Sequence, residues 1–256
     1  MPALNGKKAL VCGGSEGIGL ATAQALAAHG AEVTLLARRE GPLQHALSTL
    51  PATQGQRHRY LVADVTALAE ALPAITDAGY GILINNSAGP AGGALLAASD
   101  AQLLAVFQQH VIGNQQLLRA VVPGMKAAGW GRIVNIISTS VKEPIAMLGV
   151  SNTIRGAVAG WAKTLASELA AEGITVNNVL PGYTRTQRLD QILKERAVAA
   201  GKSEAAIAAA MLATVPAGRF ADPEEVAHAV AFLCHPQSAY INGINLPVDG
   251  GRTKSL

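Results

Sequence analysis

Short apolar runs alternate regularly with longer helical segments along this chain, and few folds accommodate such a pattern. The expected strands are residues 8–12, 33–37, 59–63, 81–85, 132–137, 174–180 and 243–248. The expected helices between them are 18–29, 43–50, 99–129, 149–172 and 188–212, and a last one opens at Pro223. Such alternation is typical of a parallel sheet covered by helices on both faces. We therefore predict one doubly wound Rossmann-type α/β domain over residues 1–256, with a seven-stranded, mostly parallel sheet.

The composition fits one soluble domain and argues against several classes of protein. The chain has 256 residues, half of them apolar, which is enough for one large core. Its formal charge is only +3, its basic residues are scattered and its aromatic residues are few, so we expect no nucleic-acid partner. Cys12 and Cys234 lie in no Cys/His cluster, which predicts reduced thiols and no metal site. Neither a bilayer-spanning run nor a signal-peptide pattern is present, so we expect no membrane association and a cytoplasmic location.

A glycine-rich segment, Gly13-Gly14-Ser15-Glu16-Gly17-Ile18-Gly19, directly follows the first expected strand and opens a helix. Glycines permit a tight turn and let the backbone approach a pyrophosphate, while the helix N-terminus supplies N–H donors and positive potential. A glycine-rich turn without a ligand is the alternative, but the strand–turn–helix context favours a dinucleotide site.

The second expected strand ends at Ala37-Arg38-Arg39, where the adenosine ribose of a dinucleotide should lie. A carboxylate at this point suits the free 2′-hydroxyl of NAD, whereas an arginine suits the 2′-phosphate of NADP. A solvated surface pair is the alternative, and Glu16 places an opposing negative charge in the loop. We predict NADP(H) in preference to NAD(H).

These residues resemble the short-chain dehydrogenase/reductase family over nearly the whole chain. Cys12 to Gly19 is similar to its TGxxxGxG motif, with cysteine replacing threonine, and Asn85 to Gly89 resembles its NNAG motif with an inserted serine. Asp64-Val65 resembles the dipeptide that touches adenine. Pro181-Gly182 and Thr186 resemble the segment that holds the nicotinamide carboxamide, and residues 248–251 resemble the terminal sheet motif. The cofactor-contacting residues that we expect are Gly13, Ser15, Glu16, Gly17, Ile18, Gly19, Arg38, Arg39, Asp64, Val65, Asn86, Ser87, Arg155, Pro181, Gly182, Thr184 and Thr186.

The catalytic residues depart from the set that the resemblance implies, which is Asn, Ser, Tyr and Lys with the last two spaced YxxxK. Ser138 occupies the position of the family serine, but the expected YxxxK reads Ser151-Asn-Thr-Ile-Arg155. The family asparagine position holds His110, with Asn114 one helical turn later. A serine hydroxyl is a far weaker acid than tyrosine, and an arginine loses its proton too reluctantly to relay it as lysine does. The predicted catalytic residues are therefore Ser138, Ser151, Arg155 and His110.

Several groups are candidates for the missing acid. His110 comes first because histidine titrates near neutral pH, although a structural hydrogen bond within a helix explains it equally well. Tyr183, Lys142 and a water oriented by Ser138 and Ser151 are the other candidates, while a pocket-wall tyrosine and a solvated loop lysine are the simpler interpretations.

Two functional hypotheses follow. The first is an NADP(H)-dependent oxidoreductase that reduces a carbonyl, or an activated C=C bond of an enone or enoyl-thioester, with a non-standard proton donor. The second is a catalytically silent NADP(H)-binding sensor or scaffold. Residues 187–215 are expected to form a helical lid over a small-molecule substrate. That stretch contains three basic residues, Arg188, Lys194 and Arg196. They are either ordinary exposed helix charges or contacts to an anionic or carrier-bound substrate. The resemblance also implies a homotetramer or homodimer.

Overall fold

The computed structural model describes residues 3–255 and contains one seven-stranded sheet in the order β3-β2-β1-β4-β5-β6-β7. Its strands are β1 (Lys8–Cys12), β2 (Glu32–Ala37), β3 (Arg59–Val62), β4 (Ile82–Asn85), β5 (Gly131–Ile136), β6 (Ile174–Pro181) and β7 (Asn245–Val248). Every neighbouring pair is parallel, so the sheet is wholly parallel rather than mostly parallel. The predicted fold class is confirmed.

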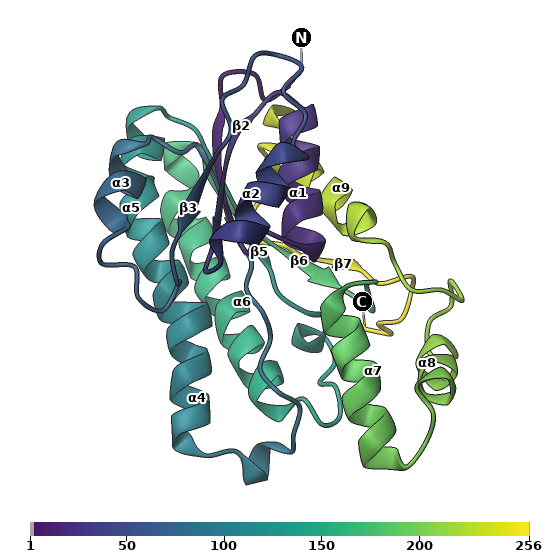
Figure 1. Ribbon diagram of the computed structural model, residues 1–256. Helices are drawn as coiled ribbons and strands as arrows, with labels where there is room; N and C mark the ends of the chain where they lie inside the picture. The colour runs from purple at the N-terminus through teal and green to yellow at the C-terminus, as the bar shows by residue number, and fades with distance from the viewer. Residues whose placement is uncertain (1–2, 256) are drawn as a thin grey trace.

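Helices cover both faces of the sheet, as the sequence pattern predicts (Figure 1). One face packs against α1 (Gly17–Ala28), α2 (Glu40–Ser48) and α9 (Pro223–Cys234), and the other against α3 (Leu72–Asp77), α5 (Gly113–Ala127) and α6 (Gly149–Leu169). Alternate residues of β1 enter opposite cores, with Val11 on the α1 side and Leu10 on the α5 side. Burial on both faces explains why the strands are continuous apolar runs.

The chain order reverses between β1 and β4, because β2 and β3 extend to one side of β1 and the later strands to the other. In sheets of this kind the crevice beyond the carboxyl ends of the strands at the reversal is where ligands bind. The Gly13–Gly19 segment follows β1 and the Asn86–Gly89 segment follows β4, so both lie at this point.

A row of asparagines, three of them buried, links the four neighbouring strands from β4 to β7. Asn85 donates to Asn135, Asn135 to Asn178, and Asn178 to Asn245, each over 2.8 Å. The residues are register partners on β4, β5, β6 and β7. Because buried amides must be hydrogen-bonded, this ladder fixes the strand that delivers Asn86 and Ser87 to the crevice.

Three expected elements differ in the structure. The helix expected over 99–129 is α4 (Asp100–Phe107), a π-helical turn (Gln108–Ile112) and α5, although Ser99 caps it as predicted. The helix expected over 188–212 is two helices, α7 (Gln187–Ala200) and α8 (Glu204–Leu212), because Gly201 adopts a left-handed φ of 60° and Ser203 caps the second. The short α3 was not expected, since six residues carry too little periodicity to predict a helix.

No helix within residues 3–255 is long and apolar enough to cross a membrane, and that range contains no group of three or more His, Cys, Asp or Glu arranged for a metal. Cys12 and Cys234 are free and buried on different elements.

Candidate functional site

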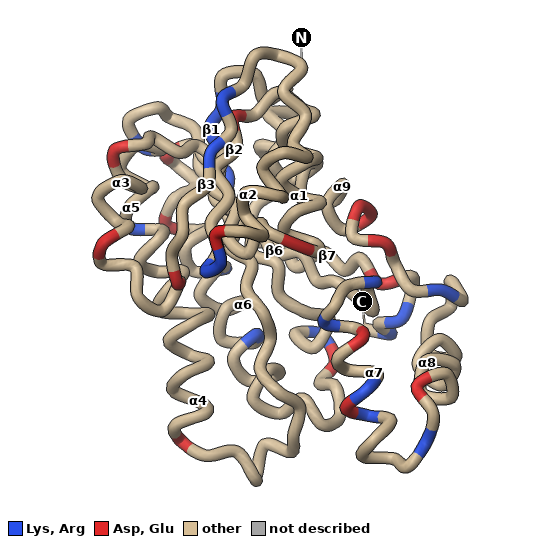
Figure 2. Tube along the Cα trace, in the orientation of Figure 1, with Lys and Arg blue, Asp and Glu red and all other residues tan. Residues whose placement is uncertain are grey.

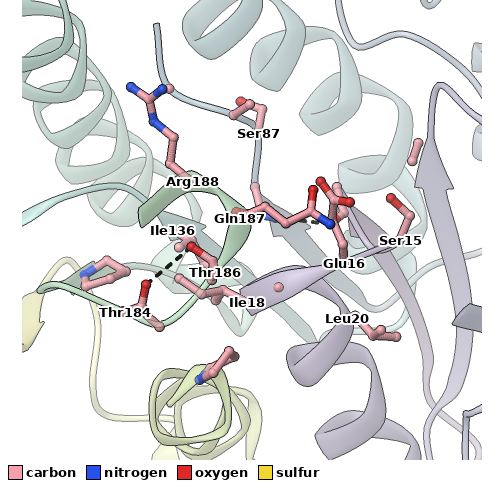
Figure 3. A pocket seen from close by; sticks show the side chains of 18 of the residues that line it. Ser15, Glu16, Ile18, Leu20, Ser87, Ile136, Thr184, Thr186, Gln187 and Arg188 are labelled. Carbon is pink, nitrogen blue, oxygen red and sulfur yellow. Dashed lines mark hydrogen bonds between the residues drawn. The ribbon is translucent and has the colours of Figure 1, made fainter. Parts of the chain in front are cut away.

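A cleft of about 900 Å³ opens at the carboxyl ends of the strands. Its walls come from the loops after β1, β2, β3, β4, β5 and β6, and from the start of α7. All of the predicted cofactor-contacting residues line this cleft except Gly19. Figure 3 shows Ser15 and Glu16 toward one end of it, and Ser87 and Arg188 together toward another. Segments that are far apart in the sequence therefore converge on one cavity.

The glycine-rich turn has the close backbone approaches that only glycine permits. A Cβ on Gly19 would collide with the Gly13 carbonyl oxygen, so Gly19 is required for packing and does not face the cleft. Gly17 has a φ of 55°, and a Cβ there would project to 3.2 Å from Thr186 Cγ2 across the cleft. Asn86 Nδ2 donates to the carbonyl oxygens of Cys12 and Gly13, each over 3.3 Å. A side chain on Gly17 would therefore narrow the cleft between the glycine-rich turn and Thr186.

Charged groups surround the adenosine end of the cleft. Arg38 is exposed beyond β2, and Arg39 pairs with Glu16 at 3.4 Å, so the negative charge in the glycine-rich turn has a cationic partner. Asp64 accepts hydrogen bonds from the Thr66 amide and hydroxyl at 2.8 and 2.7 Å. These bonds, with a smaller contribution from the charge of Arg38, lower the pKa of Asp64 against the opposing effect of burial.

Arg155 lies at the inner end of the cleft and is only 7% exposed. Its Nη1 donates to the Ile136 carbonyl oxygen at 3.0 Å and its Nη2 to that of Ser87 at 3.4 Å. Burial, and then the nearby charge of Arg188, lowers the pKa of Arg155 to about 10. The guanidinium remains protonated at neutral pH, and it joins the loops that follow β4 and β5.

Ser138 lines the cleft immediately after β5. Its Oγ accepts a hydrogen bond from the Ser140 amide at 3.1 Å, which fixes the hydroxyl oxygen and leaves its O–H free to donate. The carbonyl oxygen of Ile136, two residues before Ser138, accepts the hydrogen bond from Arg155. Arg155 is therefore tied to the segment that carries Ser138.

His110 lies behind the cleft wall and does not line the cavity. It is only 3% exposed on the π-helical turn, and its Nδ1 is 2.9 Å from Ser87 Oγ. Burial, reinforced by the charge of Arg155, lowers the pKa of His110 to about 3. The imidazole is therefore neutral near pH 7 and contacts the Ser87 hydroxyl, which does line the cleft.

The remaining acid candidates are placed differently. Tyr183 lines the cleft, edge-on to Phe220, with the Arg252 guanidinium 4.9 Å from its ring centroid. Neither Ser151, in the first turn of α6, nor Lys142 is among the residues that line the cavity, and the buried Asn114 is not among them either. The structure thus brings Ser138, Arg155 and Ser87 together at one cavity and leaves Ser151 outside it.

The start of α7 contributes cleft residues that the sequence did not single out as cofactor or catalytic positions. Gln187, Arg188, Leu189 and Ile192 all line the cavity, whereas α8 contributes none of its wall. Arg188 and Leu189 lie four and three residues before Ile192, a spacing that places the three side chains on one side of the helix. This spacing is the feature of the sequence from which the wall could have been predicted. Only the first part of the expected 187–215 lid borders the cleft.

Comparison with known proteins agrees with this geometry. Residues 13–253 match the family model described as "Enoyl-(Acyl carrier protein) reductase". The chain is 36% identical over 252 residues to the 3-oxoacyl-(acyl-carrier-protein) reductase FabG of Vibrio cholerae, covering 97% of this chain and 98% of that protein.

Solved structures show the same likeness. An L-sorbose reductase from Gluconobacter frateurii, complexed with NADPH and L-sorbose, has a TM-score of 0.91 and 31% identity, with 100% of each chain covered. YwfH, an NADPH-dependent reductase involved in bacilysin biosynthesis, has a TM-score of 0.91 and 26% identity, covering 98% of this chain and 99% of that chain. The fold and the cleft define a dinucleotide-binding α/β protein, and the chain belongs to the short-chain dehydrogenase/reductase family.

Proposed function

We propose that this protein is an NADP(H)-dependent oxidoreductase that reduces a carbonyl, or an activated C=C bond, with a non-standard proton donor. The observation that carries the proposal is the single cleft that gathers the glycine-rich turn, Arg38, Ser138 and Arg155. The Vibrio cholerae relative is a 3-oxoacyl-(acyl-carrier-protein) reductase, which favours a ketone over the other substrates.

The cleft fits a phosphorylated dinucleotide. The Gly17 turn leaves open the space that a Cβ would fill, and the adjoining N-terminus of α1 favours a pyrophosphate. Arg38 is exposed beside the position of the adenosine ribose, which suits a 2′-phosphate. The G. frateurii reductase is complexed with NADPH, which supports the same choice here. When bound, this cofactor supplies the hydride, and the protein supplies orientation and the proton.

Three residues, Ser138, Arg155 and Ser87, take over the work that tyrosine and lysine do in the usual YxxxK motif of the family. Ser138 donates its free O–H to the substrate oxygen and positions it. Arg155 holds the loop carbonyls of Ser87 and Ile136 and places a positive charge where negative charge develops during reduction. His110 is neutral and buried, so it fixes the Ser87 hydroxyl and does not release a proton itself. A water between the Ser138 and Ser87 hydroxyls delivers the proton to the alkoxide oxygen and takes up a replacement proton from bulk solvent through the open cleft.

The test is NADPH consumption with a panel of ketones and enones. We expect turnover of at least one ketone, and a loss of about 100-fold in kcat for Ser138→Ala, as for removal of one donor to a developing oxyanion. Ser167→Ala, on the exposed side of α6, is the matched control and should retain wild-type kcat. NADPH binding without any turnover across the panel would overturn the proposal in favour of a silent nucleotide-binding protein.

A further inference from the structure

Two guanidinium groups converge on one point of the cleft, above Gly89. A Cβ built on Gly89 would lie 3.8 Å from Arg155 Nη2 and 4.0 Å from both Nε and Nη2 of Arg188. Arg155 reaches this point from α6, and Arg188 from the first turn of α7. These are the three nearest atoms beyond the glycine's own chain neighbours, each at ordinary van der Waals distance, so both cations border the same point.

Neither cation has a counter-charge among residues 3–255. No carboxylate oxygen of that range lies within 4.0 Å of Arg155 or Arg188. Arg155 contacts the two main-chain carbonyls already described, and Arg188 donates to the Pro90 carbonyl at 2.6 Å and to Gln191 Oε1 at 3.1 Å. Two neighbouring like charges, one of them almost fully buried, are costly without an anion.

The phosphates of the proposed cofactor have positions of their own. The pyrophosphate belongs at the N-terminus of α1 and the 2′-phosphate beside Arg38, on the β1–β2 side of the reversal, whereas Arg155 reaches the cleft from α6 on the β5 side. Arg188 follows Thr186, which faces Gly17, so the approach of Arg188 to Arg155 above Gly89 is what assigns it to the inner end of the cleft. An oxidised nicotinamide ring is itself positively charged, so it would add to the charge of the two arginines rather than compensate it.

We infer that Arg155 and Arg188 form a subsite for an oxyanion of the substrate, most simply a carboxylate next to the group that is reduced. This inference rests on the proposed function, because it places the anion beside Ser138. A guanidinium has five N–H donors in a planar fork, so each arginine keeps donors beyond those already used. A carboxylate above Gly89 would accept from both arginines at once.

The first experiment measures binding rather than turnover. The NADP⁺-saturated protein is titrated calorimetrically with oxalate, and with oxamide as the neutral analogue of the same shape. We expect oxalate to bind and oxamide to bind at least tenfold more weakly. Arg188→Gln should weaken oxalate binding at least tenfold, while Lys194→Gln, which removes the same charge from another position of α7, should leave it unchanged.

A second variant fills the subsite and keeps both charges. Gly89 has no left-handed φ and its Cβ position is free of clashes, so Gly89→Ala should fold normally. Its methyl group occupies the space between the guanidiniums, and we expect weaker oxalate binding with the melting temperature unchanged.

The outcomes separate the possible sources of the anion. If Arg188→Gln weakens NADP⁺ binding tenfold and leaves oxalate binding intact, the two arginines bind a cofactor phosphate and the inference is overturned. It is also overturned if the NADP⁺-loaded protein binds oxalate no better than oxamide. Failure of the protein to bind NADP⁺ at all would instead contradict the proposed function, since that result comes before any addition of oxalate.

Discussion

At the residue scale, His110 shows how burial changes the role of a side chain. The sequence places a titratable group at the family asparagine position, but burial and Arg155 lower the pKa of His110 to about 3. The hydrogen bond to Ser87 joins residues 23 positions apart, which meet only when β4 and the π-helical turn pack together. The position of this histidine was therefore predictable from the sequence, whereas its protonation state was not.

This pKa shift predicts how stability depends on pH. The unfolded chain binds a proton at His110 near pH 6.5, whereas the folded chain binds it only near pH 3, so acid favours the unfolded state between these values. The free energy of unfolding should therefore fall as the pH drops, by about 2 kcal/mol between pH 7 and pH 5 from this group alone. Urea denaturation at both pH values measures the change.

Replacement of the histidine tests the cause. His110→Asn should remove this part of the pH dependence, whereas His45→Asn, on the exposed side of α2, should leave it. An identical pH dependence in wild type and His110→Asn would show that the folded protein protonates this imidazole at its ordinary pKa.

Arg38 carries the prediction of cofactor preference. Because its guanidinium is exposed beside the adenosine end of the cleft, Arg38→Ala should weaken NADPH binding by about tenfold, the loss of about 1.4 kcal/mol. NADH lacks the 2′-phosphate, so its dissociation constant should not change, and it serves as the internal control. Fluorescence titration with both nucleotides measures the pair of constants, and an equal loss for the two would assign Arg38 a role other than phosphate recognition.

At the element scale, the sequence pattern predicted every strand to within two residues at each end, since buried parallel strands are short apolar runs with clear flanks. The helices were less predictable. The π-helical turn that carries His110 and the break at Gly201 both lie inside stretches whose helical periodicity continues past them. The convergence of Arg155 and Arg188 above Gly89 also required the fold, because the two residues lie on different helices, α6 and α7.

The break between α7 and α8 predicts opposite effects for two glycine substitutions. Gly201 has a φ of 60°, so Gly201→Ala should lower the free energy of unfolding by about 1 kcal/mol. Gly124 lies inside α5 with no left-handed φ, and a Cβ there would make only an ordinary contact 3.9 Å from Gly79 Cα, so Gly124→Ala should raise it by about 0.5 kcal/mol. Chemical denaturation compares both with wild type. An equal effect of the two substitutions would contradict a left-handed helix end at Gly201.

At the scale of the whole molecule, α4 presents an apolar surface that the described part of the chain does not cover. Leu104 and Phe107 are 68% and 38% exposed, and Asp100 is the only charged residue of α4 (Figure 2). The neighbouring α6 exposes the small residues Gly156, Ala157 and Gly160, which permit close approach. Apolar patches of this kind are typical of protein interfaces.

We therefore expect this face to join copies of the chain into a homodimer or homotetramer. Light scattering after size exclusion should give a mass that is a multiple of the 26.2 kDa protomer. Leu104→Glu should shift that mass toward the protomer, while Val198→Glu, at another exposed apolar position on α7, should not. A wild-type mass of one protomer would contradict the prediction.

If one cleft binds NADPH and directs its hydride to a substrate beside Ser138, the hydride itself can be followed into the product. The experiment is mass spectrometry of the product formed from NADPH that carries deuterium at both C4 positions of the nicotinamide, with a ketone that carries a carboxylate next to the carbonyl group. We predict a hydroxy acid that contains one deuterium, and far less labelled product when Ser138 is replaced by alanine over the same reaction time. Bound NADPH that transfers no label to any ketone or enone would show that the cleft holds the cofactor without using it.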